Sequence, residues 1–134
     1  MKRVALDANV ILRCLLADHP ILSPKVKELF EAAEEGKLKL FLDEVVLAEV
    51  VWTLSSFHKI SREKIAEQLR ILISQKWLFC RRKKLILEVL KNFAEKNIDY
   101  IDAWLFSVAK KLNFQIASFD KDFDRLDRKI LILI

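Results

Sequence analysis

Short unbroken runs of apolar residues alternate along the chain with longer segments in which apolar residues recur every three or four positions. The runs predict strands at residues 4–6, 38–42, 78–80, 115–118 and 130–134. The longer segments predict helices at residues 10–16, 24–35, 44–57, 62–74, 84–96 and from 100 onward, with one helical turn at 121–126. Strands that alternate with helices are typical of α/β folds.

The strand segments carry no polar alternation, which is typical of strands buried on both faces of a parallel sheet. Helix ends are marked by capping residues: Ser23 before Pro24, Asp43, Ser61, and Asp99 in a capping box with Asp102. Gly36 occupies the left-handed position that closes a helix.

Two helices have a predicted core face. The faces comprise Leu85, Val89, Leu90 and Phe93 in one helix, and Ile101, Leu105, Val108 and Leu112 in the other. No linker rich in Pro, Gly or Ser interrupts the pattern, so we predict one domain over residues 1–134.

Composition excludes several classes of site. With one glycine, the chain cannot form a glycine-rich phosphate loop. Two cysteines and two histidines support neither a disulfide scaffold nor a zinc site. No signal peptide or membrane-spanning run is visible, so a reduced, cytoplasmic setting is expected. The net charge of +5 mildly favours a polyanionic partner.

Four carboxylates stand in apolar surroundings: Asp7, Glu49, Asp102 and Asp120. Asp7 and Asp120 follow predicted parallel strands, whose carboxyl ends carry the binding crevice in open α/β sheets. A buried charge without a partner costs several kcal/mol of stability. We therefore expect a positively charged partner to compensate these four carboxylates. The alternatives are ordinary: Asp7 and Asp120 as helix caps, and Asp102 as part of a capping box.

Carboxylates without Cys or His ligands suit hard divalent cations, Mg²⁺ or Mn²⁺, as one ion or two. Such ions activate a water and stabilise the oxygens of a phosphodiester during in-line displacement.

Four segments in order resemble the motifs of PIN domains. They are residues 4–12 around Asp7, 46–54 around Glu49, 99–103 around Asp102, and 118–123 around Asp120. The resemblance covers essentially the whole chain. The length of the chain is similar to that of the stand-alone VapC-type toxins of toxin–antitoxin pairs. Ser118 stands where the family often has Thr, which keeps the hydroxyl.

The resemblance implies a three-layer α/β fold with a mainly parallel central sheet flanked by helices. It implies a Mg²⁺- or Mn²⁺-dependent endoribonuclease that leaves a 5′-phosphate and a 3′-hydroxyl. Asp7, Glu49, Asp102 and Asp120 would be the catalytic metal-site carboxylates, with Asp122 as a further candidate. Asn9 and Ser118 would support the site. A homodimer and a cognate antitoxin partner are also implied.

The densest basic run is Arg81, Arg82, Lys83 and Lys84. Together with Arg13 it is a candidate for contacts to RNA phosphates, with a solvated loop as the alternative. A different class of function also stays open: a non-catalytic module whose acidic pocket binds Mg²⁺ for regulation or for binding RNA or a partner. Metal-dependent cleavage of RNA separates the two.

Overall fold

A computed structural model describes residues 1–127 and 129–133 of the chain. It divides into two compact units, Met1–Lys83 and Lys84–Ile134, each of which is described by itself. The last residue of the predicted strand 130–134, Ile134, lies outside the described residues.

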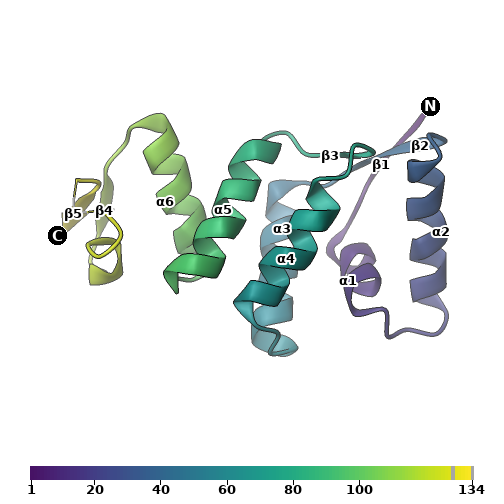
Figure 1. Cartoon of the computed structure of the whole chain (residues 1–134), viewed down its shortest axis with the longest axis horizontal. Coiled ribbons are helices and arrows are strands. Elements are labelled where there is room, and N and C mark those ends of the chain that lie inside the picture. Colours follow the sequence, from purple (N-terminus) through teal and green to yellow (C-terminus); the bar gives the residue numbers. More distant parts are fainter. Residues whose placement is uncertain (128, 134) are drawn as a thin grey trace. The chain divides into compact units, whose positions relative to one another are not determined.

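The first unit is built on three parallel strands in the order β1-β2-β3 (Figure 1). These strands are β1 (Lys2–Ala5), β2 (Leu38–Phe41) and β3 (Leu78–Phe79), and Lys2 pairs with Leu38 while Leu40 pairs with Leu78. Its helices are α1 (Ala8–Leu16), α2 (Leu22–Glu34), α3 (Glu44–Trp52) and α4 (Arg62–Ile73), with a π-helical turn at Thr53–Phe57.

The second unit contains most of α5 (Lys83–Lys96), α6 (Tyr100–Leu112), β4 (Ile116–Ser118), a 3-10 turn at Lys121–Phe123, and β5 (Leu131–Leu133). β4 and β5 pair in parallel as a sheet of their own, with Ile116 opposite Leu131. The predicted α/β class with parallel strands is confirmed, and every predicted strand and helix has a counterpart.

Most of the predicted caps are confirmed. Asp43 accepts a hydrogen bond from the backbone N–H of Glu44 at 2.8 Å, and Ser61 accepts one from Lys64 at 3.3 Å. Gly36 has φ +82°, the left-handed conformation that a side chain would disfavour.

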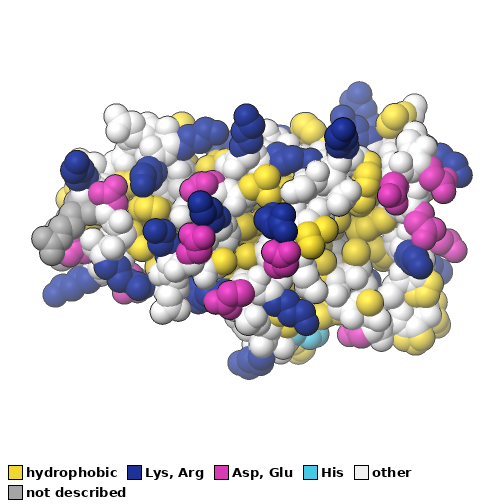
Figure 2. Space-filling view, in the orientation of Figure 1, with side chains coloured by type: hydrophobic (Ala, Val, Ile, Leu, Met, Phe, Trp, Pro, Cys, Tyr) yellow, Lys and Arg dark blue, Asp and Glu magenta, His cyan; other side chains and the backbone are white. Residues whose placement is uncertain are grey.

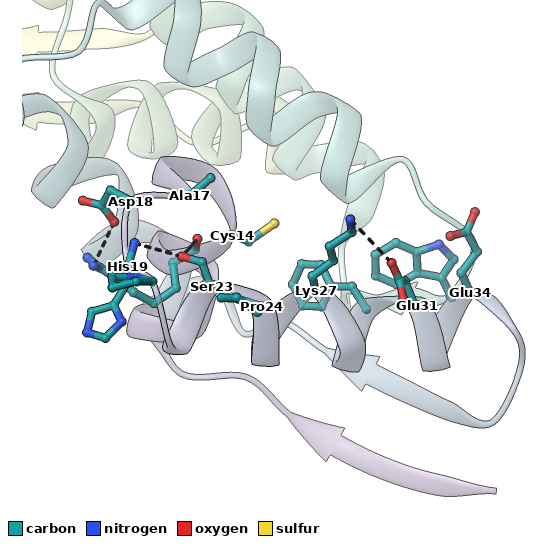
Figure 3. Close-up of a pocket in the computed structure, with 13 residues that line it drawn as sticks. Cys14, Ala17, Asp18, His19, Ser23, Pro24, Lys27, Glu31 and Glu34 are labelled. Carbon is teal, nitrogen blue, oxygen red and sulfur yellow. Dashed lines mark hydrogen bonds and ion pairs between the residues drawn. The ribbon is translucent and has the colours of Figure 1, made fainter.

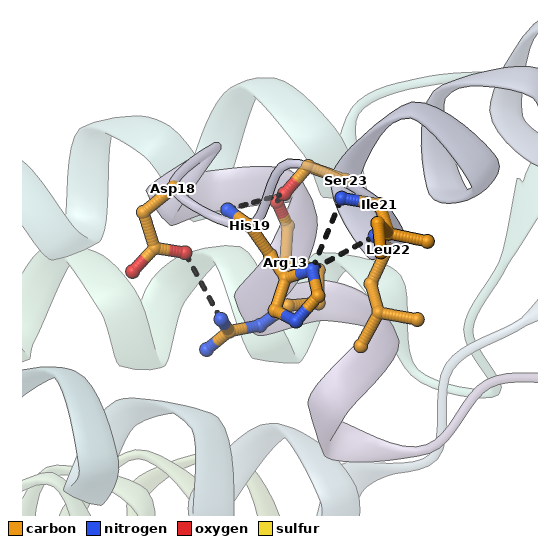
Figure 4. A network of polar contacts seen from close by, with 6 residues as sticks. All are labelled: Arg13, Asp18, His19, Ile21, Leu22 and Ser23. Carbon is orange, nitrogen blue, oxygen red and sulfur yellow. Dashed lines mark hydrogen bonds and ion pairs between the residues drawn. The ribbon is translucent and has the colours of Figure 1, made fainter.

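The predicted start of α2 was wrong. The helix begins at Leu22, so Ser23 lies inside it instead of capping it. The exposed backbone donors are satisfied by His19 instead, whose Nδ1 accepts from Ile21 N–H at 3.2 Å and Leu22 N–H at 2.9 Å (Figure 4). The Ser23 hydroxyl joins this turn to α1 by accepting from His19 N–H and donating to Arg13 carbonyl oxygen.

The prediction that β1 is buried on both faces was also wrong. Lys2, Arg3 and Ala5 are exposed, and full burial begins only at Leu6. The central strand β2 contributes the buried Leu40. Within the described sheet, β1 is hydrogen-bonded on one side only, which explains why its residues are less covered.

The predicted core face of α5 is confirmed, whereas that of α6 was wrong. Ile101, Leu105 and Leu112 are exposed and Val108 is half-buried, while the buried face consists of Tyr100, Ala103, Phe106, Ser107 and Ala109. A buried side-chain hydrogen bond joins α6 to α5. The Asn92 amide donates to the Ser107 hydroxyl at 2.8 Å, and this hydroxyl donates to Ala103 carbonyl oxygen at 2.8 Å.

Because Asn92 and Ser107 are both more than nine-tenths buried, removing one partner leaves the other without its hydrogen bond. We expect Ser107→Ala to lower the free energy of unfolding by about 1–3 kcal/mol. Ser74→Ala is the matched control, because the exposed Ser74 hydroxyl makes the same kind of bond to Arg70 carbonyl oxygen. It should cost about 0.5 kcal/mol or less in urea unfolding. Equal losses in the two variants would contradict the role of burial.

Candidate metal and nucleic-acid site

Asp7 and Glu49 line one small cavity of the first unit. The cavity has a volume of about 240 Å³, and its wall is formed by Asp7, Ala8, Asn9, Leu12, Glu49 and Thr53. Asp7 and Asn9 come from the start of α1, and Glu49 comes from α3, which packs against α1. Two of the four predicted carboxylates and the predicted supporting residue Asn9 are therefore brought together.

Asp7 also caps α1, because its Oδ1 accepts from the backbone N–H of Val10 at 3.2 Å. The cap fixes the direction of the carboxylate at the point where the chain leaves β1. A carboxylate has two oxygens and about four lone-pair positions, so capping leaves room for a metal ion or its water. Capping and metal binding are compatible roles for this residue.

Asp120 is held in the same way in the second unit. Its backbone N–H donates to the Ser118 hydroxyl at 2.9 Å, and its Oδ1 accepts from Asp122 N–H at 2.9 Å. Ser118, predicted to support the site, thus positions Asp120 at the end of β4. Asp122 lies 3.8 Å from the Arg125 guanidinium, which also donates to Asn97 carbonyl oxygen.

Asp102 lies in the first turn of α6 and is half-buried. Partial burial raises its pKa above the ordinary value, and the negative charges of Asp99, Asp120 and Asp122 raise it further. The predicted capping box does not form, because the side chain of Asp99 makes no capping hydrogen bond. Asp102 therefore shares its surroundings with other carboxylates, an arrangement that a cation would stabilise.

The argument from buried charge was wrong for three of the four carboxylates. Asp7, Glu49 and Asp120 are exposed, so no large desolvation penalty needs to be offset. Glu49 lies on the outer side of α3, where the neighbouring Val45 and Trp52 are exposed as well. Leu6, Ala8 and Val50, which adjoin Asp7 and Glu49 in the sequence, are buried, whereas Phe119, which adjoins Asp120, is exposed.

Within the described residues, no group of three or more His, Cys, Asp or Glu side chains lies close enough to hold a metal ion. What the structure provides is a pair of carboxylates in the first unit and a set of interacting carboxylates in the second. Their chemistry, hard oxygen donors with an amide beside Asp7, fits Mg²⁺ or Mn²⁺ and does not fit soft metals.

Most of the predicted RNA-binding residues already have partners inside the protein. Arg81 pairs with Asp43 at 2.9 Å, and Arg82 forms two hydrogen bonds to Glu44 at 2.7 and 2.6 Å. The Arg82 guanidinium, hydrogen-bonded to the carboxylate, holds the pKa of Glu44 below its ordinary value. The Lys83 ammonium donates to the carbonyl oxygens of Gln75 and Leu78, and Lys84 is exposed at the start of α5.

Arg13 lies elsewhere, in the wall of a cavity of about 800 Å³ that is lined mainly by α1, α2 and the residues that join them (Figure 3). It pairs with Asp18 at 3.0 Å (Figure 4). The cavity wall includes neither Asp7 nor Glu49. Burial raises the pKa of the Cys14 thiol in the same wall, so this thiol is not activated as a nucleophile.

Thr53 lines the cavity of Asp7 and Glu49 but was missed from the sequence. It begins the π-helical turn, and its backbone N–H reaches the carbonyl oxygens of Glu49 and Val50. The signal that could have found it is spacing, because residues four apart share one side of a helix.

The comparison with protein families covers nearly the whole chain. The model of the family described as PIN domain matches residues 4–129. The chain belongs to the PIN-domain family. This match runs through both units and includes every predicted site residue. The chain is also 26% identical over 125 residues to "VapC ribonuclease" of Aquifex aeolicus (strain VF5), and the alignment covers 92% of each chain. Within the described part of this PIN domain, no helix is long and apolar enough to cross a membrane.

The raised pKa of Asp102 predicts a pH-dependent stability. Folding favours its protonated form, so its contribution to stability is present at low pH and is lost as the pH rises through the raised pKa. In EDTA, Asp102→Asn should therefore unfold at higher urea concentration than the unmodified chain at neutral pH. The difference should shrink on acidification.

Glu28→Gln, which changes an exposed acid of α2, is the control and should show no such trend. A variant Asp102→Asn that is less stable than the unmodified chain at neutral pH would contradict the repulsion inferred for Asp102.

Proposed function

We propose that this PIN domain is a divalent-metal-dependent endoribonuclease that hydrolyses RNA phosphodiester bonds in the cytoplasm. The observation that carries the proposal is the family match over residues 4–129, combined with the convergence of Asp7, Asn9 and Glu49 on one cavity. The similarity to a VapC ribonuclease supports RNA as the substrate.

We propose that Asp7, Glu49, Asp102 and Asp120 all serve the same reaction by binding Mg²⁺ or Mn²⁺, as one ion or two, with Asp122 as an additional ligand. When bound, such an ion activates a water and stabilises charge on the phosphate oxygens. The residues of the chain hold the donor oxygens in place: α1 orients Asp7 through its cap, and Ser118 orients Asp120. Asn9 offers an amide to a metal-bound water or to phosphate.

The proposal is tested by four single variants, Asp7→Asn, Glu49→Gln, Asp102→Asn and Asp120→Asn. Each should lower Mn²⁺-dependent cleavage of labelled RNA by at least about a hundredfold, because each removes a carboxylate that would hold the metal ion needed to stabilise the transition state. Asn is also a good helix cap, so the Asp7 and Asp120 variants should keep their fold.

Glu28→Gln is the matched control and should cleave normally, and EDTA should stop cleavage by the unmodified chain. Full activity in any of the four variants would remove that residue from the site. Binding of RNA and Mg²⁺ without fragments, across several RNAs, would favour the non-catalytic module instead.

We further propose that the protein is the toxin of a toxin–antitoxin pair and a homodimer. The similarity to a VapC ribonuclease supports the assignment as a toxin, while the homodimer and an antitoxin that blocks the site are implied by the family resemblance alone. When the protein is expressed with the small reading frame beside its gene, light scattering should give the mass of two chains plus the bound partner, and no RNA cleavage should be seen. A monomer that cleaves RNA at full rate in the presence of the product of that reading frame would contradict both the assignment as a toxin and the homodimer.

A further inference from the structure

A second polar cavity lies within the second unit, along the helices α5 and α6. Its volume is about 460 Å³, and it is lined by both helices and by Leu126. The two helices are joined by only residues 97–99, a connection short enough to make them antiparallel neighbours. The cavity is therefore a groove that follows a helical hairpin.

The groove is strongly basic. Five exposed lysines line it against two exposed glutamates: Lys84, Lys91 and Lys96 with Glu88 and Glu95 on α5, and Lys110 and Lys111 on α6. Figure 2 shows Lys and Arg side chains over these helices, with acidic side chains between them. The excess of positive charge favours an anionic ligand.

Helix electrostatics do not account for all of these lysines. Lys110 and Lys111 lie in the last turn of α6, where a cation is favourable, but Lys84 lies in the first turn of α5, where it is unfavourable. No acidic residue occupies that first turn. Because the hairpin is antiparallel, the first turn of α5 and the last turn of α6 meet at one end. Lys84 therefore adds to a local positive charge that an anion would stabilise.

The floor of the groove is rigid and polar. The buried Asn92 and Ser107 line it, and the Ser107 hydroxyl accepts from the Asn92 amide and donates to Ala103 carbonyl oxygen. This bond uses one of the two N–H donors of the amide. The Lys110 ammonium is held 5.4 Å from the centre of the Phe106 ring, which orders one of the basic side chains.

Asp102, in the first turn of α6, is not part of the groove lining, but it lies on the same side of the helix as residues that are. Asp102, Phe106 and Lys110 are spaced four residues apart and so lie along one side of the helix. Lys110 lies eight positions after Asp102 along α6, which corresponds to a rise of about 12 Å. A single small anion cannot reach from one end to the other, whereas a chain of phosphates can.

We infer that the α5–α6 groove binds the phosphate backbone of single-stranded RNA. The inference rests on the proposed function for its substrate class. Lys84, Lys110 and Lys111 contact phosphates at the end of the groove formed by the first turn of α5 and the last turn of α6. The groove thus contributes affinity for RNA without taking part in the chemical step.

The test compares two double charge reversals in the full chain. Lys84→Glu with Lys110→Glu changes the groove, and Lys25→Glu with Lys64→Glu makes the same change of net charge on exposed residues of α2 and α4. Binding of fluorescently labelled single-stranded RNA is measured by anisotropy in EDTA over a range of salt concentrations, so that no cleavage intervenes.

The groove variant should bind at least about tenfold more weakly than the control variant. For the groove variant, the slope of log affinity against log salt concentration should be less steep. The reduction should be about 0.7 for each phosphate that the substituted side chains no longer neutralise. In Mn²⁺ the groove variant should show a raised KM with a nearly unchanged kcat, a split that a merely structural role would not produce.

Equal affinity and equal salt dependence in the two double variants would overturn the inference, and the groove would then serve another anionic partner, such as an acidic protein segment. Weakened RNA binding in the groove variant with no cleavage by the unmodified chain would keep the groove and overturn the proposed nuclease. Cleavage that is lost in Glu49→Gln but unaffected in the groove variant would keep the nuclease and overturn the groove.

Discussion

Parallel pairing of strands is the constraint on which the site of the first unit depends. β1, β2 and β3 run in one direction, so the segments that follow them, at Asp7, Asp43 and Cys80, leave the sheet at the same edge. Asp7 and Asp43 each cap the helix that follows. The same hydrogen bonds that start α1 and α3 therefore fix carboxylates at one edge of the sheet, and α3 brings Glu49 into the cavity of Asp7.

Ion pairing divides the acidic residues of that edge into two kinds. Arg81 and Arg82, which follow β3, neutralise Asp43 and Glu44 at the start of α3. A bidentate pair such as Arg82 with Glu44 is geometrically well defined, so these acids are committed to holding α3 in place. Asp7 and Glu49 are left as the carboxylates that face a cavity. Arg81, Arg82 and Lys83 of the basic run thus have a structural role that the sequence alone did not indicate.

The sequence predicted the elements well because their signals are local. Periodicity, the caps Asp43 and Ser61, and the left-handed Gly36 depend on residues close in the chain. The sequence-based prediction was wrong where tertiary packing decides which face of a helix is buried. On α6, the buried face is the one with Ala103 and Ser107, where the Ser107 hydroxyl bonds to Asn92 of α5, and not the more apolar face with Ile101 and Leu105. The α2 cap failed because an imidazole replaced the expected hydroxyl.

For the candidate site, the sequence predicted residue types and their order, but its argument from buried charge was wrong for Asp7, Glu49 and Asp120. It inferred buried charges from apolar neighbours, although a helix or strand places sequence neighbours on different sides. Exposed carboxylates stay accessible to water, which suits oxygens that bind a hydrated cation such as Mg²⁺. Asp102 differs, because partial burial and three nearby acids oppose its charge. A divalent cation would relieve that repulsion most strongly at Asp102, which makes this residue the best place to detect metal binding directly.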